Sequence, residues 1–459
     1  MLKIYNSLTQ QKEFFKPIES GKVKLYVCGP TVYDFCHVGN ARSFTAFDGI
    51  VRYLHFRGYD VVYVRNITDI DDKIIKRANE NHEDFNVIVE RFTAAFREDM
   101  QQLNLLTPTH EPRATECIPH IIAMIEKLIS NEYAYIAANG DVYYNVRRFS
   151  SYGCLSHRNI DELESGARVE ISDIKNDPLD FVLWKMAKPD EPSWESPWGK
   201  GRPGWHIECS AMSARFLGET FDMHGGGKDL IFPHHENEIA QSEGSTGKKF
   251  VNYWLHAGYL QIDKEKMSKS LGNFFTIRDV LQDHSPEALR YLFISGHYRS
   301  PLNFSKELLE QSRHSLERFY TVLRDVPPTS EEWNDSKYEK EFIDAMDDDF
   351  NTPVALSVLF ELAHEIQRLR EKDLNRAMKY AMVLKKLGGV LGILQDDPLH
   401  FFQGKKDVDV EKIEKLIAAR NRARAEKNWA EADRIRKELS DLSIVLEDGA
   451  SGTSWKKNC

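Results

Sequence analysis

Two histidines and three acidic residues lie close together in the segment DLIFPHHENEIA, residues 229–240. On a helix that begins after the proline, His234 and Glu238 stand four positions apart on one face, which suits two ligands of one metal ion. Cys28 at a predicted strand end and Cys209 at a predicted helix start could complete a Cys₂-His-Glu set. Soft thiolates in such a set favour zinc. The alternative is a solvated His-Glu face with both cysteines in a core.

Two further segments carry groups that can bind phosphates. His37-Val38-Gly39-Asn40 lies between a predicted strand and the next helix, where helix N–H groups favour a phosphate. Gly39 permits close approach, and His37 and Asn40 can donate hydrogen bonds, although a capping histidine is the alternative. KMSKS, residues 266–270, forms a loop that can clamp a triphosphate and stabilise a departing pyrophosphate. Its alternative is a solvated lysine loop.

The elements that must position these residues begin with a strand–helix–strand unit. Residues 23–33 have the pattern of a buried strand, 40–57 have the helical period, and 59–67 are rich in β-branched and aromatic residues. This unit predicts the α/β class, with a Rossmann-like parallel sheet. An Asn-Gly turn inside 133–146 predicts a hairpin. Long amphipathic patterns predict that 305–395 are nearly all helical.

Composition is that of an ordinary soluble protein. The 459 residues are 29% charged with a net charge of −10, which argues against indiscriminate nucleic-acid binding but allows a local basic surface. From Phe401 onward, 13 Lys and Arg face 11 Asp and Glu, so the tail is basic by two charges. No apolar run approaches the ~18–20 residues of a membrane span. Six scattered cysteines do not form a disulfide framework, so a cytoplasmic location is expected.

Four segments together resemble one enzyme family. CGPTVYDFCHVGNAR (28–42), WHIECSAM (205–212), HGGGKDLIFPHHENE (224–238) and KMSKSLGN (266–273) are similar to motifs of the cysteinyl-tRNA synthetases, which are class I aminoacyl-tRNA synthetases. KMSKS is the second motif of that class in full, and HVGN stands where the class carries HIGH. Asn40 replaces the final histidine of that motif and can still donate a hydrogen bond. The resemblance extends over the whole chain.

The resemblance implies an activity and the residues that perform it. Enzymes of this family activate L-cysteine with ATP, which carries Mg²⁺, and transfer it to the terminal adenosine of cysteine tRNA. One zinc ion would bind the substrate thiolate and thereby distinguish cysteine from serine. The expected zinc ligands are Cys28, Cys209, His234 and Glu238. The expected phosphate contacts are His37, Gly39, Asn40, Lys266 and Lys269; the ribose or adenine contact is Asp229; and the cysteine contacts are Thr31, Thr68, Trp205 and His224. For the cysteine contacts, core packing or capping is the alternative.

The resemblance also implies an order of domains. Residues 1–305 would form the catalytic domain, with an insertion at about 110–200 and the KMSKS region at about 255–305. A helical bundle over 306–397 would brace the tRNA. The small basic domain 398–459 would read the anticodon, because aromatic and basic side chains can stack on and pair with unstacked bases.

The expected partners are cysteine tRNA, L-cysteine and ATP, without a membrane, and the full set of domains in one chain favours a monomer. Trp455 is the aromatic residue expected at the anticodon, and Asp69, Asp71 and Asp72 are expected to form a solvated acidic turn rather than a second metal site. Two other functions remain open. One is a ligase of the same fold that joins cysteine to an amino sugar, and the other is a tRNA-binding protein without activity.

Overall fold

The computed structural model describes residues 1–159, 174–189, 191–262, 265–266, 275–330, 336–403, 410–442, 444–449 and 452–457. Lys269 lies outside these residues, and Lys266 is described only through the backbone of a short strand. No helix formed by the described residues has both the length and the apolar character needed to cross a membrane.

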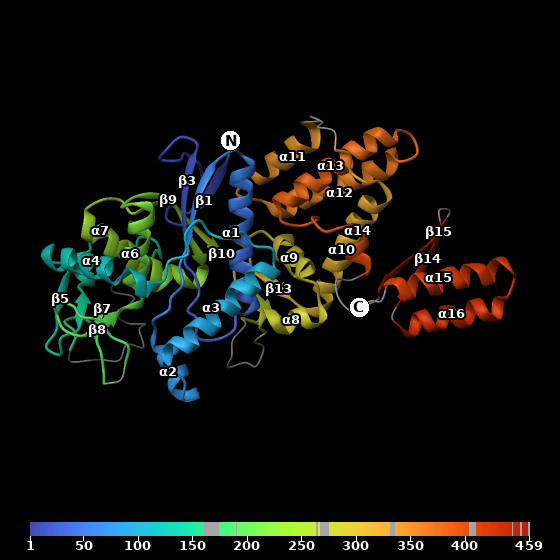
Figure 1. Ribbon diagram of the computed structural model, residues 1–459. Coiled ribbons are helices and arrows are strands. Elements are labelled where there is room, and N and C mark those ends of the chain that lie inside the picture. Colours follow the sequence, from blue (N-terminus) through green and yellow to red (C-terminus); the bar gives the residue numbers. More distant parts are fainter. Residues whose placement is uncertain are drawn as a thin grey trace.

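A four-stranded parallel sheet forms the centre of the molecule (Figure 1). Its order is β10 (Val251–Ala257), β9 (Phe221–Gly227), β3 (Lys22–Val27) and β4 (Asp60–Arg65). Helix α1 (Val38–Phe56) connects β3 to β4, so the predicted strand–helix–strand unit and the α/β class are confirmed. Because β3 and β9 are parallel neighbours, the residues that follow them meet at one edge of the sheet despite their distance in the sequence.

Alternate residues of β3 face two different layers. Val23, Leu25 and Val27 pack in a cluster with side chains of α1. Tyr26 and the following residue, Cys28, belong to a second cluster with side chains of α6 (Trp205–Leu217). Both faces of the sheet are therefore covered, as parallel sheets require. The same alternation directs Cys28 toward the helix that carries Cys209.

Between β4 and β9 the chain builds a second, antiparallel sheet. Its order is β5 (Ala134–Ile136), β6 (Val142–Tyr144), β7 (Phe181–Met186) and β8 (Gly201–Pro203). The pairing of β5 with β6 confirms the hairpin predicted at the Asn-Gly turn. The other elements of this part are α2 (Asp72–Asn81), α3 (Phe85–Gln102), η1 (Ala114–Cys117), α4 (Ile118–Ser130) and η2 (Val146–Arg148).

Short elements surround the central sheet. The strands β1 and β2 form an antiparallel pair, and β12, β11 and β13 form a small sheet in that order. These elements are β1 (Lys3–Asn6), β2 (Gln11–Phe14), η3 (Lys228–Leu230), η4 (Ile231–His235), α7 (Glu236–Thr246), β11 (Leu260–Ile262), β12 (Glu265–Lys266), α8 (Ile277–Asp283), α9 (Pro286–Ser295) and β13 (Leu302–Phe304).

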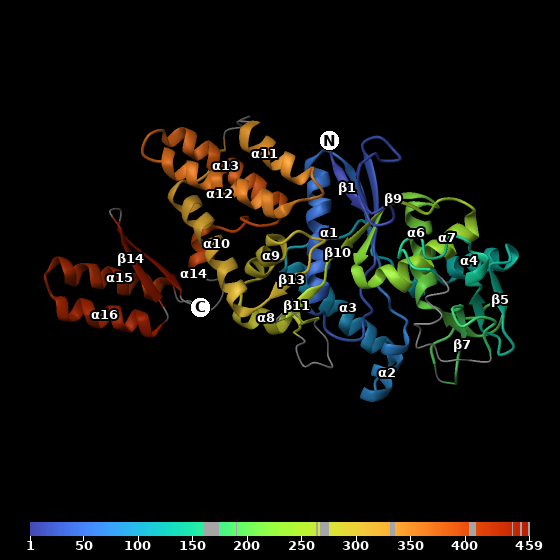
Figure 2. The same cartoon turned by 180° about the vertical axis from the view of Figure 1, so that it is seen from behind.

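A helical bundle follows and shares its core with the central sheet. Its helices are α10 (Lys306–Asp325), α11 (Ser336–Met346), α12 (Thr352–Leu369) and α13 (Leu374–Val390), followed by the short α14 (Pro398–Gln403). One cluster of buried side chains runs from the sheet through α1 into α10, α12 and α13. Figure 2 shows the bundle lying beside α1 and α9. The described helices agree with the helical region predicted for 305–395.

A buried ion pair between α1 and α9 is also tied to the end of the bundle. Arg290 of α9 is fully buried and donates to the Asp48 carboxylate of α1, which is itself 2% exposed. The same guanidinium donates to the backbone carbonyl of Leu391, directly after α13, at 2.9 Å. Gly392 has a φ of +75°, and a Cβ there would meet the Arg290 guanidinium at 2.2 Å. This close approach explains the glycine.

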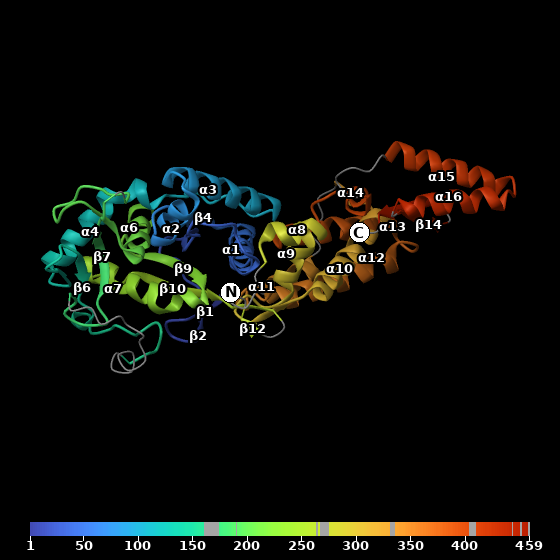
Figure 3. The same cartoon turned by 90° about the horizontal axis from the view of Figure 1, so that it is seen from below.

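The C-terminal part has a small core of its own. Helices α15 (Val410–Ala425) and α16 (Trp429–Asp441) pack beside the hairpin of β14 (Ile444–Gly449) and β15 (Gly452–Lys457). In Figures 1 and 3 it lies at the end of the molecule opposite α4. Trp455 is 5% exposed in this core and donates to Glu414 Oε1 at 2.8 Å, so the expected stacking of Trp455 on anticodon bases is wrong. Trp429 is instead 60% exposed.

Candidate functional site

Four separate elements bring the predicted metal ligands together. Cys28 follows β3, Cys209 lies in the second turn of α6, His234 lies in η4, and Glu238 lies in the first turn of α7. One ligand atom from each lies within 4.8 Å of the others, and all four residues are buried. The group therefore offers two sulfurs, one imidazole nitrogen and one carboxylate oxygen to a single ion.

The distances within this group match tetrahedral coordination. With metal–sulfur bonds of about 2.3 Å, two thiolates on a tetrahedral zinc ion stand about 3.8 Å apart. Cys28 Sγ and Cys209 Sγ are 3.8 Å apart, far longer than a disulfide bond. His234 Nε2 lies 3.1 Å and Cys28 Sγ lies 3.5 Å from Glu238 Oε1. The spacing predicted for positions 234 and 238 thus brings the two side chains together.

A second set overlaps the first, since Cys28 and Glu238 also lie near His224 and His235. His224 Nε2 contacts Glu238 Oε2 at 2.8 Å, and His235 Nε2 lies 3.3 Å from Cys28 Sγ. His235 Nδ1 is in turn hydrogen bonded to His256 Nε2 at 2.8 Å. The set with Cys209 offers two sulfurs, which favours a soft ion, whereas His224 and His235 are placed to orient its ligands.

The surroundings of the group set its ionisation. Burial raises the pKa of the Cys28 thiol well above its ordinary value. A hydrogen bond from that thiol instead lowers the pKa of Cys209 to about 6. Burial opposes ionisation of Glu238, but the imidazoles of His224 and His234 outweigh it and lower the pKa of the carboxyl to about 2. Two of the four donors, Cys209 and Glu238, are therefore anionic near neutral pH and can attract a metal cation.

One cavity of about 360 Å³ joins the metal-compatible group to the HVGN segment. Cys28 is among its lining residues, and so are His37, Gly39 and Asn40. The other expected contacts that line it are Thr31, Trp205 and Asp229. Two groups of chemically distinct residues thus share one space.

The HVGN segment begins α1 in a rigid geometry. His37 is the N-cap, and its Nδ1 accepts a hydrogen bond from the backbone N–H of Asn40 at 3.2 Å. His37 is therefore a helix cap, as the alternative interpretation expected, but this does not prevent it from also binding a phosphate. An accepting Nδ1 leaves the proton of the neutral imidazole on Nε2, where it can donate.

Another part of the cavity lining is tied to the same helix. Arg42, in the first turns of α1, is 2% exposed and donates to the carbonyls of Gly258 and Tyr259 at 2.6 and 2.5 Å. Gly258 and Tyr259 line the cavity. The backbone N–H of Val38 donates to the carbonyl of Phe275, which fixes the described end of the segment after KMSKS. Sequence reasoning missed Arg42, although its place within HVGNAR was visible.

Sequence comparison assigns this arrangement to a family. Residues 14–314 match the model of the class I (C) tRNA synthetase catalytic domain, residues 341–395 match the DALR domain, and residues 410–455 match the cysteinyl-tRNA ligase anticodon binding domain. The curated cysteine–tRNA ligase of Coxiella burnetii (strain Dugway 5J108-111) is 59% identical over 99% of this chain and 100% of its own length. That of Pasteurella multocida (strain Pm70) is 57% identical over the full length of both chains. The chain belongs to the cysteine–tRNA ligase family.

Solved structures agree with a class I synthetase fold. Methionyl-tRNA synthetase of Mycobacterium tuberculosis, in complex with methionyl-adenylate, superposes with a TM-score of 0.57 at 14% identity, over 81% of this chain and 89% of the other. A structure described as a putative arginyl-tRNA synthetase from Campylobacter jejuni gives a TM-score of 0.56 over 84% and 95%. At these identities the likeness concerns the fold of this cysteine–tRNA ligase family member.

Thr68 and His224 are not among the residues that line the cavity. Thr68 is 1% exposed, and its backbone N–H donates to the carbonyl of Pro30 at 3.0 Å, which holds the strand ends together. His224 is fully buried against Glu238. Neither of these two expected cysteine contacts therefore lines the cavity directly.

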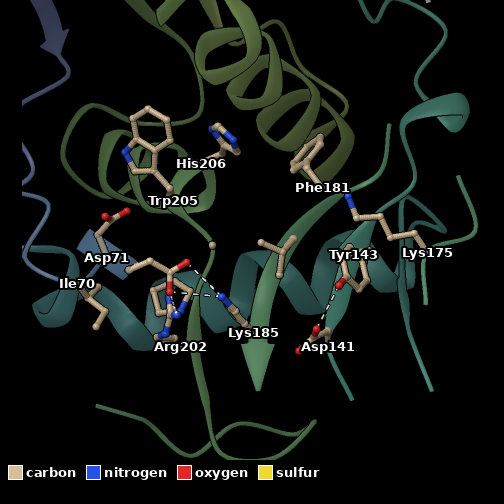
Figure 4. A pocket seen from close by; sticks show the side chains of 14 residues that line it. Ile70, Asp71, Asp141, Tyr143, Lys175, Phe181, Lys185, Arg202, Trp205 and His206 are labelled. Carbon is tan, nitrogen blue, oxygen red and sulfur yellow. Dashed lines mark hydrogen bonds and ion pairs between the residues drawn. The ribbon is translucent and has the colours of Figure 1, made fainter. Parts of the chain in front are cut away.

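A second cavity of about 420 Å³ lies beyond Trp205 (Figure 4). Trp205 borders both cavities, and its ring stacks on His234 with centroids 4.2 Å apart. His206, which sequence reasoning missed, lines the second cavity and is hydrogen bonded to His234 at 2.8 Å. The histidines of WHIECSAM and PHHENE could have been grouped as one cluster from the sequence, but their mutual distances could not.

The acidic turn after β4 is only partly solvated. Asp69 is 2% exposed and accepts from the backbone and hydroxyl of Thr115 at 3.0 and 2.6 Å, so the expectation of a solvated residue is wrong there. Asp71 caps α2, and Asp72 is exposed and paired with Arg202. The difference at Asp69 comes from its distant partner Thr115 in η1, which the local acidic pattern does not reveal.

Proposed function

We propose that this chain attaches L-cysteine to cysteine tRNA in two steps at one site. The cysteine carboxylate attacks the α-phosphate of ATP, and the cysteinyl group then passes to the terminal adenosine of the tRNA. The observation that carries this proposal is the cavity lined both by Cys28 and by the HVGN segment. Family membership, with a match to a cysteine-specific anticodon domain, supports the choice of amino acid and of tRNA.

The metal-compatible group fits zinc. Its two thiolates, one imidazole and one carboxylate are ligands that zinc prefers, and the sulfur–sulfur distance of 3.8 Å suits tetrahedral coordination. A zinc ion held by Cys28, Cys209, His234 and Glu238 would bind the substrate thiolate and discriminate against the hydroxyl of serine. His224 would hold the Glu238 carboxylate in place through its 2.8 Å contact.

Polar groups along the cavity would position ATP and cysteine. His37 and Asn40 would donate to the phosphates, with Gly39 allowing close approach and the helix N-terminus adding favourable charge. Lys266 and Lys269 remain our candidates for stabilising the departing pyrophosphate, with ATP bound as its Mg²⁺ complex. Asp229 is proposed for the ribose or adenine side.

The substrate cysteine would lie between Thr31 and Trp205, with Thr68 and His224 acting from behind. Trp205, 39% exposed, covers His234 and so borders the thiolate position. This arrangement holds the carboxylate toward the phosphates while the sulfur faces the metal-compatible group. Positioning of this kind supplies much of the rate enhancement in acyl-phosphate chemistry.

The same proposal assigns the remaining parts. Residues 1–305 would activate and transfer cysteine, the bundle 306–397 would brace the tRNA, and 398–459 would read the anticodon. Trp429 is our candidate for stacking on an anticodon base, because it is the tryptophan exposed in this part of the chain as far as the structure describes it. We also propose a monomer that acts in the cytoplasm.

The decisive experiment is cysteine-dependent exchange between ATP and labelled pyrophosphate, run in parallel with serine. We expect exchange with cysteine and almost none with serine, because a hydroxyl cannot replace a soft thiolate. Removing the metal with a chelator should abolish the preference, and zinc should restore it. No exchange with cysteine would reject the activation step, and discrimination that survives complete metal removal would reject the zinc assignment.

Two other functions are disfavoured. A ligase that joins cysteine to an amino sugar would not need an anticodon domain, whereas residues 410–455 match one. A tRNA-binding protein without activity would not need the assembled group of Cys28, Cys209, His234 and Glu238. Charging of a cysteine tRNA transcript, compared with transfer to glucosamine derivatives, separates all three.

A further inference from the structure

The second cavity has the chemistry of a site for a flat, neutral ligand. Tyr143, Phe181 and Trp205 line it with aromatic surface, as Figure 4 shows. Tyr144 stacks on the Phe181 ring with centroids 4.9 Å apart, which holds that ring at the cavity wall. Aromatic side chains held in this way are stacking platforms for nucleobases.

The charges around this cavity argue against a phosphate. Lys185 and Arg202 both pair with Asp72, so part of their positive charge is already compensated. The cationic and acidic side chains that line the cavity are equal in number: Lys175, Lys185 and Arg202 against Asp71, Asp72 and Asp141. A balanced set of donors and acceptors suits a base, whereas an anion needs a positive excess.

One buried donor at the cavity lacks a partner. Arg202 is 4% exposed, and its Nε has no hydrogen-bond partner among the described residues. The nearest recorded carboxylate, that of Glu191, is 3.7 Å away, beyond hydrogen-bond length. Asp71 supplies a half-buried carboxylate on the same side of the cavity in Figure 4. A donor and an acceptor together complement a ring nitrogen and an amino group of a base.

The position of the cavity identifies which base. Trp205 borders both cavities, so an occupant of the second lies one indole ring away from the substrate cavity. In the transfer step, the reacting hydroxyl of the terminal ribose must enter the substrate cavity. The base of that nucleotide is attached to the neighbouring carbon of the same ribose, so it must lie directly beside the reacting centre. Bases further along the tRNA strand need not lie beside the reacting centre.

We propose that this cavity binds the adenine of the terminal tRNA nucleotide, stacked on Phe181 and hydrogen bonded by Arg202 and Asp71. The inference rests on the proposed function, since it places the acceptor of that reaction. On this proposal, Trp205 stands between the activated cysteine and the adenine of the acceptor nucleotide. The ribose hydroxyl of that nucleotide would pass the edge of the indole ring to reach the activated cysteine.

A binding experiment tests the cavity independently of catalysis. The affinities of the protein for a cysteine tRNA transcript with and without the terminal adenosine are compared. Loss of one stacked base should weaken binding by the wild-type chain about tenfold or more. The Phe181→Ala variant should lose much less on the same truncation. Because each variant is compared with itself, general weakening by misfolding does not mimic this result, and an equal loss in both would overturn the proposal.

A kinetic experiment tests the role in transfer. The single-turnover rate of cysteine transfer to tRNA is divided by the rate of cysteine-dependent pyrophosphate exchange. The exchange reaction needs no tRNA, so this ratio isolates the transfer step from the activation step. Phe181→Ala should lower this ratio about tenfold. Ile136→Ala, at an exposed position on strand β5 of the same sheet, is the matched control and should leave the ratio unchanged. A ratio unchanged in Phe181→Ala, or a fall in transfer that only follows exchange, would overturn the proposal.

A third comparison identifies the atoms that are read. In Asp71→Asn, the new side chain can still cap α2, so the fold is preserved. The wild-type chain should transfer about tenfold less well to tRNA ending in purine riboside, which lacks the amino group of adenosine. Asp71→Asn should narrow that difference. If Asp71→Asn kept the full preference for adenosine over purine riboside, the Asp71 contact would be rejected. If the wild-type chain showed no cysteine-dependent pyrophosphate exchange, the proposed activation step would be rejected, but the binding experiment would still test the cavity.

Discussion

Two cysteines of one short segment lie in contrasting surroundings. Cys28 faces Cys209 and Glu238, whereas Cys36 packs among apolar side chains such as Val32 and Phe44. Burial raises the pKa of both thiols, but among the described residues only Cys28 belongs to a group of side chains that could hold a metal ion. The chemistry of each sulfur is thus decided by what lies across from it in the fold.

This contrast gives a paired prediction for metal content. Cys28→Ser should reduce the zinc retained by purified protein to a small fraction, because a hydroxyl replaces one of two soft ligands. Cys36→Ser should retain zinc at the wild-type level. Metal analysis after extensive desalting measures both. Equal retention in the two variants would contradict the assignment of Cys28.

A second prediction at this scale concerns Trp429. Its side chain is 60% exposed at the start of α16, and base stacking on an aromatic ring is worth about 1–3 kcal/mol. Trp429→Ala should therefore raise the KM for cysteine tRNA about tenfold in aminoacylation assays. Leu442→Ala, at another exposed apolar position after α16, is the control and should change the KM little. A normal KM in Trp429→Ala would exclude this residue from anticodon binding.

Trp429 and Trp455 also show what could not be predicted from the sequence. Both lie in the basic tail, and Trp455 was the expected base contact, but the β14–β15 hairpin turns it into the small core. The proposed ligands Cys28 and Cys209 could be inferred from residue types and from the resemblance to a family. Their 3.8 Å separation could not, because it depends on the parallel pairing of β3 with β9 and on the packing of α6.

At the scale of elements, α1 organises two parts of the lining of the 360 Å³ cavity. Its N-terminus presents His37, Gly39 and Asn40, while Arg42 donates to the carbonyls of Gly258 and Tyr259, which also line the cavity. The strand–helix–strand unit was predictable, because alternation and helical period are local properties of the sequence. The partner of a single buried arginine was not, since it depends on which loop the completed sheet brings near.

This arrangement predicts a role for Arg42 in ATP binding. Arg42→Met removes the hydrogen bonds that hold the Gly258–Tyr259 wall and should raise the KM for ATP about tenfold in the exchange assay. Arg42→Lys should recover part of the loss, because an ammonium can still reach one carbonyl. Arg52→Met is the matched control, since Arg52 lies on the same helix but contacts Asp48 and Asn104. Equal KM changes in Arg42→Met and Arg52→Met would reject the positioning role.

At the scale of the whole molecule, Arg290 pairs with Asp48 of α1 and also donates to the backbone carbonyl that follows α13, so it connects the central sheet layer to the bundle. Burial opposes ionisation of Asp48, but Arg290 and Arg52 outweigh it and lower the pKa of the carboxyl below its ordinary value. A carboxyl with a lowered pKa in the folded state stabilises the protein above its unfolded pKa, near 4. That contribution is lost as the pH falls through the folded value.

Removing the Asp48 carboxylate should therefore lower the free energy of unfolding strongly at neutral pH and less at acidic pH. Asp48→Asn leaves the buried Arg290 charge uncompensated and should cost about 3–5 kcal/mol at pH 7, with the difference from wild type narrowing below about pH 4. Urea unfolding at several pH values measures this. Asp84→Asn, at the exposed N-cap of α3, is the control, because asparagine caps a helix as well as aspartate. A pH-independent difference would contradict the ionised pair.

The spread of the metal-compatible group along the chain constrains how the protein is made. Cys28 emerges from the ribosome early, but its partners at 209, 234 and 238 follow only after the whole second sheet has been synthesised. A nascent chain therefore exposes an unpaired thiol next to the HVGN segment during most of the synthesis of its catalytic part. The complete donor set forms only when α6 packs on β3 and α7 packs on α6, so the order of synthesis would make the loading of any metal ion a late event.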